Sequence, residues 1–210
     1  MKSDSERRRT EMTIGVLALQ GDFAEHLAAL RQLGVDCREV RLPEELDPLD
    51  GLILPGGEST TFALLMESYG FVEPLRAFAL DPRPIWGSCA GLIALAREVV
   101  GMSSPIIGLL DITARRNAYG RQVESFETAL DIPALGAPPV PAVFIRAPVI
   151  ESTGPDVEVL ASLPNGAPVA VRQGTLLATA FHPELTTDRR FHEYFLDMVL
   201  DPRSSNVAAV

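Results

Sequence analysis

Short apolar segments alternate with helix-like segments along the first half of the chain, and glycine-bearing turns join them. Residues 14–19 form a continuous apolar run, as expected of a strand buried on both faces, and the run ends at Gln20-Gly21-Asp22. Apolar side chains then recur at helical spacing over residues 23–33. Residues 35–40 and 51–54 are further strand candidates. This alternation predicts an α/β fold in which a mostly parallel sheet carries helices on both faces.

The second half of the chain has a pattern more typical of β-structure. From about Leu109 onward, short strand candidates cover residues 142–145, 157–160, 168–172 and 175–181. Gln173-Gly174, between the last two candidates, predicts a hairpin turn. We interpret these strands as a short antiparallel extension of the same domain. A final helix is predicted from its apolar face, which is formed by Phe191, Tyr194, Phe195, Met198 and Val199.

Length and composition are those of one domain of ordinary size. With 210 residues, 47% of them hydrophobic, the chain can bury a full core without disulfides or a structural metal. Residues 12–200 are expected to form this domain, because the Pro-rich stretch 133–141 is too short to mark a boundary. Residues 1–11 are predicted to be a disordered extension, with Met12 a candidate natural start, and residues 201–210 a C-terminal tail.

Charge and cysteine content argue against several classes of protein. A formal net charge of −10 disfavours a nucleic-acid or anionic-membrane partner, because binding to phosphate requires clustered positive charge. No segment has the run of about twenty apolar residues that a membrane span needs. Cys37 and Cys89 are the only cysteines and cannot form a disulfide framework, so a reducing cytoplasm is the expected location.

Gly87-Ser88-Cys89-Ala90-Gly91 is the motif with the clearest chemical meaning. It follows the apolar run Pro84-Ile85-Trp86 and opens into the Ala-rich segment 92–96, which is the pattern of a nucleophile elbow with cysteine in place of serine. The glycines permit a sharp turn, and the backbone N–H groups at a helix N-terminus favour a thiolate. The motif alone is equally compatible with a small buried cysteine, the usual fate of a free thiol.

A thiolate nucleophile needs a base, and the chain has three histidines for that role. His26 and His192 fall within predicted helices, so either is readily explained as a helix-surface residue. His182 ends a predicted strand and is followed by Pro183 and Glu184. In an extended backbone residues i and i+2 point to the same side, so Glu184 can orient the His182 imidazole as the third member of a triad. Taken alone, a histidine at a strand end is more often structural.

Pro55-Gly56-Gly57-Glu58 follows a predicted buried strand and can turn backbone N–H groups toward a neighbouring strand end. The amide of Ala90 would be a second donor to an oxyanion formed during acyl transfer. Ligands of open α/β sheets bind beyond the carboxyl ends of the strands, where both segments are expected. The two glycines alone favour a plain turn. Ser59 and Thr60 are candidate N-caps of the next helix.

Taken together, these residues resemble a known family. Gly87-Ser88-Cys89-Ala90-Gly91 with His182-Pro183-Glu184 is similar to the class I, triad-type glutamine amidotransferases, whose fold is flavodoxin-like. Further segments narrow the resemblance to the glutaminase subunits of pyridoxal 5′-phosphate synthases, the PdxT family: residues 15–22, 54–61, 116–122 (Arg-Asn-Ala-Tyr-Gly-Arg-Gln), 125–127, 144–148 and 181–186. The resemblance extends from about Met12 to Leu200. Ser88 stands where the family commonly has threonine, and no change in chemistry is expected from this exchange.

The resemblance implies hydrolysis of L-glutamine to L-glutamate and ammonia, without a cofactor or a metal. Cys89 would form a γ-glutamyl thioester, His182 would act as acid and then base, and Glu184 would orient His182. Gly57 and Ala90 would supply oxyanion donors. Two arginines suit a substrate carboxylate, which a guanidinium can hold through two parallel hydrogen bonds. The glutamine-binding residues implied by motif position are Gly56, Gly57, Glu58, Arg116, Ile145 and Arg146.

The resemblance also implies a partner. The family passes ammonia to a separate synthase subunit, a (β/α)8 barrel that makes pyridoxal 5′-phosphate from a pentose phosphate and a triose phosphate. Such a barrel typically needs about 250 residues, so we expect it to be another polypeptide in a hetero-oligomeric complex. In the family the glutaminase is weak or silent until it docks. The Gln20-Gly21-Asp22 turn and the first helix are the candidate docking surface by resemblance.

Three alternative functions remain. A glutaminase of another pathway, such as histidine biosynthesis, is disfavoured by the block at 116–122. A cysteine peptidase or related hydrolase on a similar sheet would not require paired arginines, and release of ammonia from glutamine would separate the two. A catalytically dead regulatory module is disfavoured by the intact Cys89, His182 and Glu184.

Overall fold

A seven-stranded sheet, in the order β10-β11-β12-β4-β3-β1-β2, forms the centre of the part of the chain that the structure describes. The structure is a computed structural model and describes residues 11–116 and 125–201. The parallel strands are β1 (Thr13–Leu17), β2 (Asp36–Val40), β3 (Gly51–Leu54), β4 (Ile85–Ser88) and β12 (Leu176–Thr179). At one edge β11 (Pro168–Gln173) and β10 (Glu158–Ser162) continue the sheet antiparallel. The predicted mostly parallel sheet, its antiparallel extension and the β11–β12 hairpin are confirmed.

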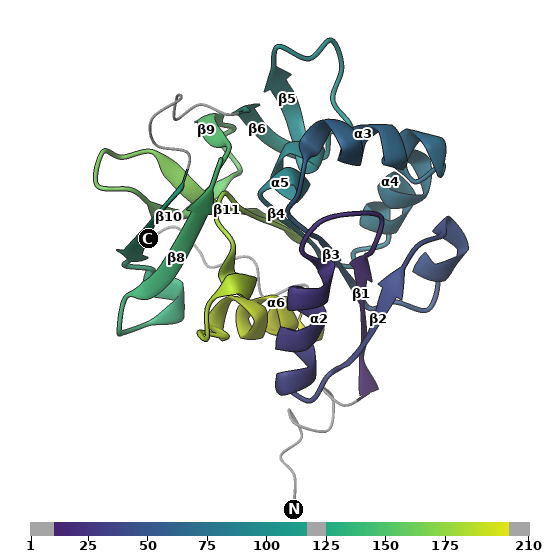
Figure 1. The fold of residues 1–210 in the computed structure, drawn as a ribbon, viewed down its shortest axis with the longest axis horizontal. Helices are drawn as coiled ribbons and strands as arrows, with labels where there is room; N and C mark the ends of the chain where they lie inside the picture. The colour runs from purple at the N-terminus through teal and green to yellow at the C-terminus, as the bar shows by residue number, and fades with distance from the viewer. Residues whose placement is uncertain (1–10, 117–124, 202–210) are drawn as a thin grey trace, which may run out of the picture.

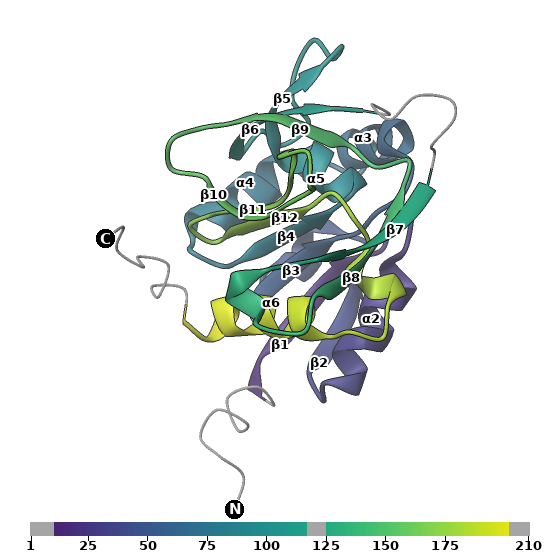
Figure 2. The same cartoon turned by 90° about the vertical axis from the view of Figure 1, so that its left-hand side faces the viewer.

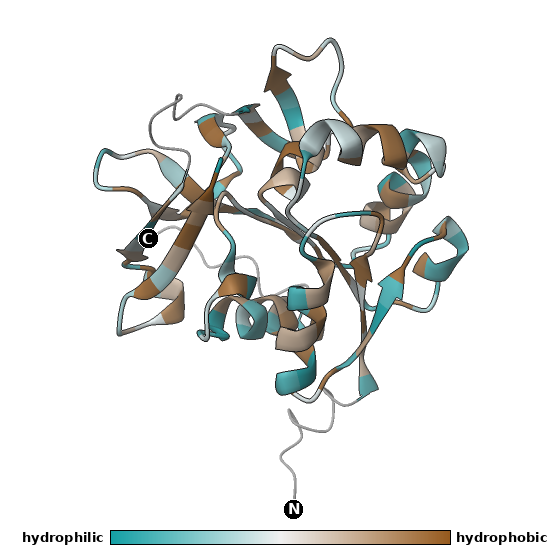
Figure 3. Ribbon diagram, in the orientation of Figure 1, coloured by the Kyte–Doolittle hydropathy of each residue, from teal (hydrophilic) through white to brown (hydrophobic). Residues whose placement is uncertain are grey.

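Helices cover both faces of this sheet, as predicted (Figures 1 and 2). Helices α2 (Phe23–Gln32) and α6 (Arg190–Leu200) lie side by side on one face, and α3 (Ser59–Ser68), α4 (Val72–Leu80) and α5 (Ala90–Leu95) lie on the other. Figure 3 shows apolar colouring along the central strands, whereas the edge strand β2 is largely hydrophilic. The central strands are therefore buried on both faces, which explains their continuous apolar runs.

Besides this antiparallel extension, the described residues form two further small sheets that the sequence did not predict. β5 (Ala96–Val100), β6 (Leu110–Arg115) and β9 (Val149–Thr153) make a three-stranded sheet, and β7 (Ser125–Leu130) pairs with β8 (Val140–Ile145). Only β10 and β11 extend the central sheet antiparallel. Three short 3-10 helices complete the described elements: η1 (Pro43–Leu46), η2 (Pro133–Leu135) and η3 (Pro183–Leu185). The β7–β8 ribbon matters for function because its end carries Ile145 to the carboxyl edge of the central sheet.

Two local expectations about helices were wrong or incomplete. The N-cap of α3 is Glu58, not Ser59 or Thr60, because the Glu58 carboxylate accepts hydrogen bonds from the backbone N–H groups of Thr60 and Thr61. Helix α4 was not predicted at all. Its first turn contains Pro74, which a helix tolerates there because the first N–H groups have no intrahelical partner.

Some sequence-based expectations lie outside the described residues. They concern the polar extension at 1–11 apart from Glu11, the tail at 201–210 apart from Asp201, and all of the 116–122 motif except Arg116. Within residues 11–116 and 125–201, no helix is long and apolar enough to cross a membrane.

Candidate active site

Cys89 occupies a sharp turn between β4 and α5, as the elbow motif predicts. Its backbone has φ 49° and ψ −99°, a conformation that L-residues rarely adopt and that costs on the order of 1–3 kcal/mol. The flanking glycines are required by close packing. A Cβ atom at Gly87 would lie 2.5 Å from the carbonyl carbon of Gly91, and one at Gly91 would lie 2.1 Å from the carbonyl oxygen of Leu54. The turn thus presents the thiol at the carboxyl end of β4, beside the ends of β3 and β12.

His182 and Glu184 contact each other directly. Nδ1 of His182 lies 2.7 Å from Oε1 of Glu184, and both side chains are buried. The pair was predicted from extended backbone geometry, but β12 ends at Thr179 and Pro183–Leu185 forms the 3-10 helix η3. The tight turn, and not an extended strand, folds the carboxylate back toward the imidazole. The contact was therefore predicted for the wrong geometric reason.

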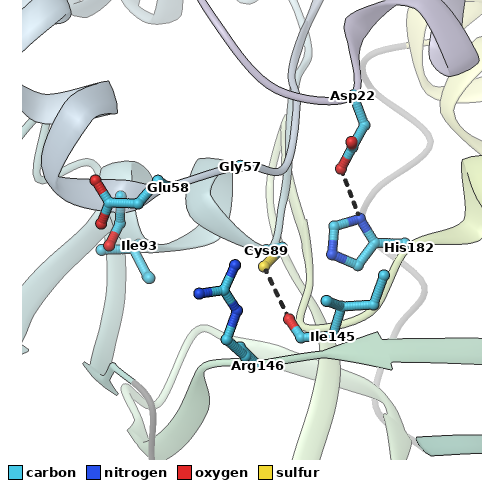
Figure 4. A pocket seen from close by; sticks show the side chains of 9 residues that line it. Asp22, Gly57, Glu58, Cys89, Ile93, Ile145, Arg146 and His182 are labelled. Carbon is cyan, nitrogen blue, oxygen red and sulfur yellow. Dashed lines mark hydrogen bonds and ion pairs between the residues drawn. The ribbon is translucent and has the colours of Figure 1, made fainter. Parts of the chain in front are cut away.

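Asp22 is a second carboxylate on the same imidazole nitrogen, and the sequence analysis did not assign it to the site. Its Oδ2 lies 3.3 Å from Nδ1 of His182, and Figure 4 shows the carboxylate pointing toward the imidazole ring. Hydrogen bonding to His182 lowers the pKa of Asp22. Asp22 follows the β1 run, so the rule that ligands gather beyond strand ends could have pointed to it.

The surroundings of His182 favour its charged form. Burial acts against the charge, but hydrogen bonds with Asp22, Cys89 and Glu184 outweigh it and raise the pKa of His182 to about 12. Burial raises the pKa of Glu184, opposed by its contact with His182. An imidazolium next to Cys89 would stabilise the negative charge that a sulfur nucleophile carries during catalysis.

A cavity of about 260 Å³ brings most of the expected residues together (Figure 4). Of the sequence-predicted site residues, its lining includes Cys89, His182, Gly57, Glu58, Ile145 and Arg146. Asp22, Ser59 and Ile93 also line it and were not predicted. The guanidinium of Arg146 points toward the space between Cys89 and Glu58 (Figure 4), and the carbonyl oxygen of Ile145 lies 4.0 Å from Sγ of Cys89. Arg146 has a φ of 43°, so two residues of this cavity have strained backbones.

The Gly56-Gly57 turn packs tightly against the base. A Cβ atom at Gly56 would lie 2.4 Å from Cε1 of His182, and one at Gly57 would lie 2.3 Å from Oε1 of Gln20. Gln20 also accepts a hydrogen bond from the backbone N–H of Glu58, at 3.1 Å. Side chains at either glycine position would therefore displace His182 or Gln20. Ala90, the expected second oxyanion donor, is fully buried as the first residue of α5.

Arg116 is placed beside the cavity but does not line it. Its Nη2 donates a hydrogen bond to Oγ1 of Thr60 at 2.7 Å and lies 3.6 Å from Oε1 of Glu58. Hydrogen bonds from the backbone N–H groups of Thr60 and Thr61 lower the pKa of Glu58 to about 2. The Glu58 carboxylate is thus charged and held at the N-terminus of α3, with Arg116 as its neighbour.

The two remaining histidines are fully buried, which corrects the helix-surface explanation. His26 of α2 and His192 of α6 have no exposed surface, and Nδ1 of His26 lies 3.2 Å from Nε2 of His192. Both rings pack edge-on against Trp86 of β4. Burial, with the nearby His192 and His182, lowers the pKa of His26 well below its ordinary value. Burial, with Arg189, lowers the pKa of His192 to about 3.

These shifts predict how stability depends on pH. Below about pH 6.5 the unfolded chain takes up protons at His26 and His192 that the folded chain does not bind, so the free energy of unfolding falls as pH drops toward 3. Above about pH 6.5 the unfolded chain loses the proton that folded His182 retains, so stability falls as pH rises toward 12. Urea unfolding across this range is expected to show the alkaline decline in the wild type and a weaker one in His182→Asn. Equal alkaline slopes would contradict the raised pKa.

Asp22, His182 and Glu184 form the one group of potential metal-binding side chains in the described residues. Their ligand atoms lie within 4.8 Å of one another. Nδ1 of His182 already contacts both carboxylates. The same arrangement is expected without a metal, for a histidine whose ring is held by two carboxylates.

Comparisons with known proteins agree with one another. The SNO glutamine amidotransferase family matches residues 16–201. "Pyridoxal 5'-phosphate synthase subunit PdxT" of Herpetosiphon aurantiacus is 57% identical over 190 residues, which cover 89% of this chain and 100% of the relative. The protein of the same name from Dehalococcoides mccartyi is 56% identical over 192 residues, covering 90% of this chain and 98% of the relative. A solved structure described as "Crystal structure of glutamine amidotransferase" superposes with a TM-score of 0.84 at 50% identity, covering 89% of this chain and 98% of that one.

Proposed function

The chain belongs to the SNO glutamine amidotransferase family, and from this membership and the geometry of its cavity we propose that it hydrolyses L-glutamine to L-glutamate and ammonia. The observation that carries the proposal is the cavity itself. It places Cys89 at a strained elbow beside His182, which Glu184 contacts at 2.7 Å. Acyl transfer of this type requires a nucleophile, a base and an orienting acid that are linked in this order by hydrogen bonds.

In the first half-reaction the Cys89 thiolate adds to the side-chain amide carbon of glutamine, and the carbonyl oxygen takes the electron pair. Backbone N–H groups of Gly57 and Ala90 are the proposed donors to this oxyanion. When the oxyanion collapses, the C–N bond breaks and the His182 imidazolium gives its proton to the departing nitrogen. Ammonia leaves and a γ-glutamyl thioester remains on Cys89.

In the second half-reaction water replaces ammonia. Neutral His182 takes a proton from the water as it attacks the thioester carbon, and collapse of the adduct breaks the C–S bond. Glutamate leaves, and the thiolate–imidazolium pair is restored. Glu184 supports both halves because its carboxylate stabilises the imidazolium and fixes the ring orientation.

The amino-acid end of glutamine is assigned to the arginine side of the cavity. Arg146 lines the space next to Cys89, and Arg116 stands outside it beside Glu58. We propose that Arg146 and Arg116 bind the substrate carboxylate and that Ile145 also contacts this end of glutamine. Glu58 would bind the ammonium group, and Gly56 would contact the substrate. Glu58 is suited to an ammonium group because its low pKa keeps it charged.

Arg146→Met and Arg116→Met are expected to raise KM for glutamine about tenfold while changing kcat less, because a carboxylate contact is equally strong in the ground and transition states. The Arg146 variant should show the larger effect, since Arg146 lines the cavity. Arg97→Met is the matched control: Arg97 pairs with Asp111 on the three-stranded sheet and does not line the cavity. Steady-state kinetics decide the matter, and an unchanged KM in both variants would remove the arginines from the site.

We further propose that the ammonia is delivered to a separate pyridoxal 5′-phosphate synthase subunit, in the cytoplasm. The relatives are named as synthase subunits, which supports delivery to such a partner. The free thiols of Cys37 and Cys89 support a reducing location. The Gln20-Gly21-Asp22 turn and α2 are the proposed docking surface. Asp22 of that turn contacts His182, so a partner seated there could alter the site directly.

The chemistry is tested by measuring glutamate and ammonia released from L-glutamine by the purified protein together with the synthase barrel. Equal amounts of the two products are expected, because one C–N bond breaks for each thioester formed. Absence of ammonia under conditions where an ester or peptide is cleaved would assign the cavity to a cysteine hydrolase instead.

A further inference from the structure

A chain of buried polar groups continues behind the base, beyond the residues that the proposed mechanism uses. Glu184 contacts His182 through Oε1, and its other oxygen, Oε2, makes no hydrogen bond to another described residue. Nε2 of His26 lies 3.4 Å from this Oε2. Burial raises the pKa of Glu184, and a donor near Oε2 would act against this rise.

His26 also contacts the residue that precedes the nucleophile. Its Nε2 lies 3.1 Å from Oγ of Ser88, the residue directly before Cys89. Ser88 is fully buried at the end of β4. One imidazole therefore contacts both the side chain of the residue before the nucleophile and the carboxylate that orients the base. The rings of Trp86 and His192 pack against His26, which has no exposed surface.

The orphaned atoms of this cluster favour one tautomer of His26. Both imidazoles are neutral because burial lowers their pKa values, so each carries one N–H. If His192 donates from Nε2 to Nδ1 of His26, then His26 carries its proton on Nε2, facing Ser88 and Glu184. In the opposite arrangement a bare Nε2 lone pair would face the Glu184 carboxylate. Nδ1 of His192 would then be a buried N–H without a partner, which is rarer than an unfilled acceptor.

We propose that His26 is a positioning residue of the active site: its Nε2–H faces the hydroxyl of Ser88 at 3.1 Å and Oε2 of Glu184 at 3.4 Å, and so helps His182 and Cys89 keep their relative geometry. This inference rests on the proposed glutaminase function. His26 does not touch the cavity that would hold glutamine, so its influence passes through Glu184 and the elbow. The prediction is a loss in kcat with little change in KM.

The kinetic test compares two substitutions at this position in the complex with the synthase barrel. His26→Leu removes the donor while keeping similar volume, and is expected to lower kcat about tenfold to a hundredfold and to shift the pH–rate profile. His26→Gln places an amide N–H near the position of Nε2 and should restore most of the activity. Leu75→Ala is the control, since Leu75 is a fully buried apolar residue of α4 and lies outside the proposed docking surface. It should lower stability and leave kcat and the pH profile unchanged.

A spectroscopic test does not depend on activity or on a variant that folds. Nitrogen-15 NMR of the wild-type protein at neutral pH should show the Nε2–H tautomer of His26, with Nδ1 unprotonated. A wild type that releases no glutamate would refute the proposed function, while the NMR result would still decide the donor role of His26. The Nδ1–H tautomer, or a His26→Leu variant with wild-type kcat and pH profile, would overturn the inference.

Discussion

Replacement of Cys89 with alanine is expected to abolish glutamine hydrolysis, with kcat falling on the order of 10⁴-fold or more. Without the thiol no thioester can form, and no other nucleophilic sulfur lines the cavity among the described residues. The fold should persist because alanine is smaller than cysteine and the side chain removed lies at the cavity wall. Glutamate release measures the loss, and circular dichroism together with binding to the synthase barrel checks that the protein is intact.

Cys37→Ala is the matched control for this substitution. Cys37 lies on the edge strand β2, where its Sγ approaches the carbonyl oxygen of Leu27 at 3.7 Å, remote from the cavity. Burial raises the pKa of the Cys37 thiol, so this group is a poor nucleophile at neutral pH. Near-wild-type activity is expected. Substantial turnover by Cys89→Ala, or an equal loss in both variants, would contradict the thioester mechanism.

His182→Asn is expected to remove nearly all activity. Glu184→Gln should have the smaller effect, so that its kcat exceeds that of His182→Asn by at least about tenfold. The base carries a proton in both half-reactions, whereas the acid only orients the ring and stabilises its charge. In Glu184→Gln the Asp22 carboxylate remains 3.3 Å from Nδ1 of His182, which gives a structural reason for residual function. Single-turnover measurements of thioester formation with glutamine would separate loss of chemistry from loss of binding.

The histidine assignment has its own control in the same assay. His192→Gln alters a buried imidazole that contacts His26 but neither Cys89 nor Glu184. It should affect stability more than kcat. If His192 or His26 proved indispensable while His182→Asn retained turnover, His182 could not be the base.

Much of the fold was predictable because its signals are local. The apolar run of β1, the run of β3 and the glycines around Cys89 are short stretches whose periodicity and turn chemistry indicate buried parallel strands and an elbow. Helix α4 was missed because Pro74 in its first turn weakens the usual signal. The division of the second half into separate sheets could not be predicted, since strand pairing depends on contacts far apart in the sequence.

The candidate site was predictable only in part, for the same physical reason. Cys89, His182 and Glu184 could be predicted because they lie in short sequence motifs. The contact of Asp22 with His182 could not, because the two residues are 160 positions apart in the sequence. The burial of His26 and His192 follows from two helices that pack together over Trp86. The sequence of each helix does not indicate which other helix it packs against. Polar residues on an inner helix face therefore looked like surface residues until the tertiary packing was known.

We propose that this chain is a glutaminase whose cavity becomes productive when a synthase partner binds. The most direct measurement is glutamate release from L-glutamine while a pyridoxal 5′-phosphate synthase barrel subunit is titrated in, with pyridoxal 5′-phosphate formation followed in the same samples. A partner can activate only by binding the competent conformation more tightly than the idle one. We predict low release from the protein alone and a saturable rise in both products as the barrel is added. Full release without the barrel, together with no physical association, would contradict the account.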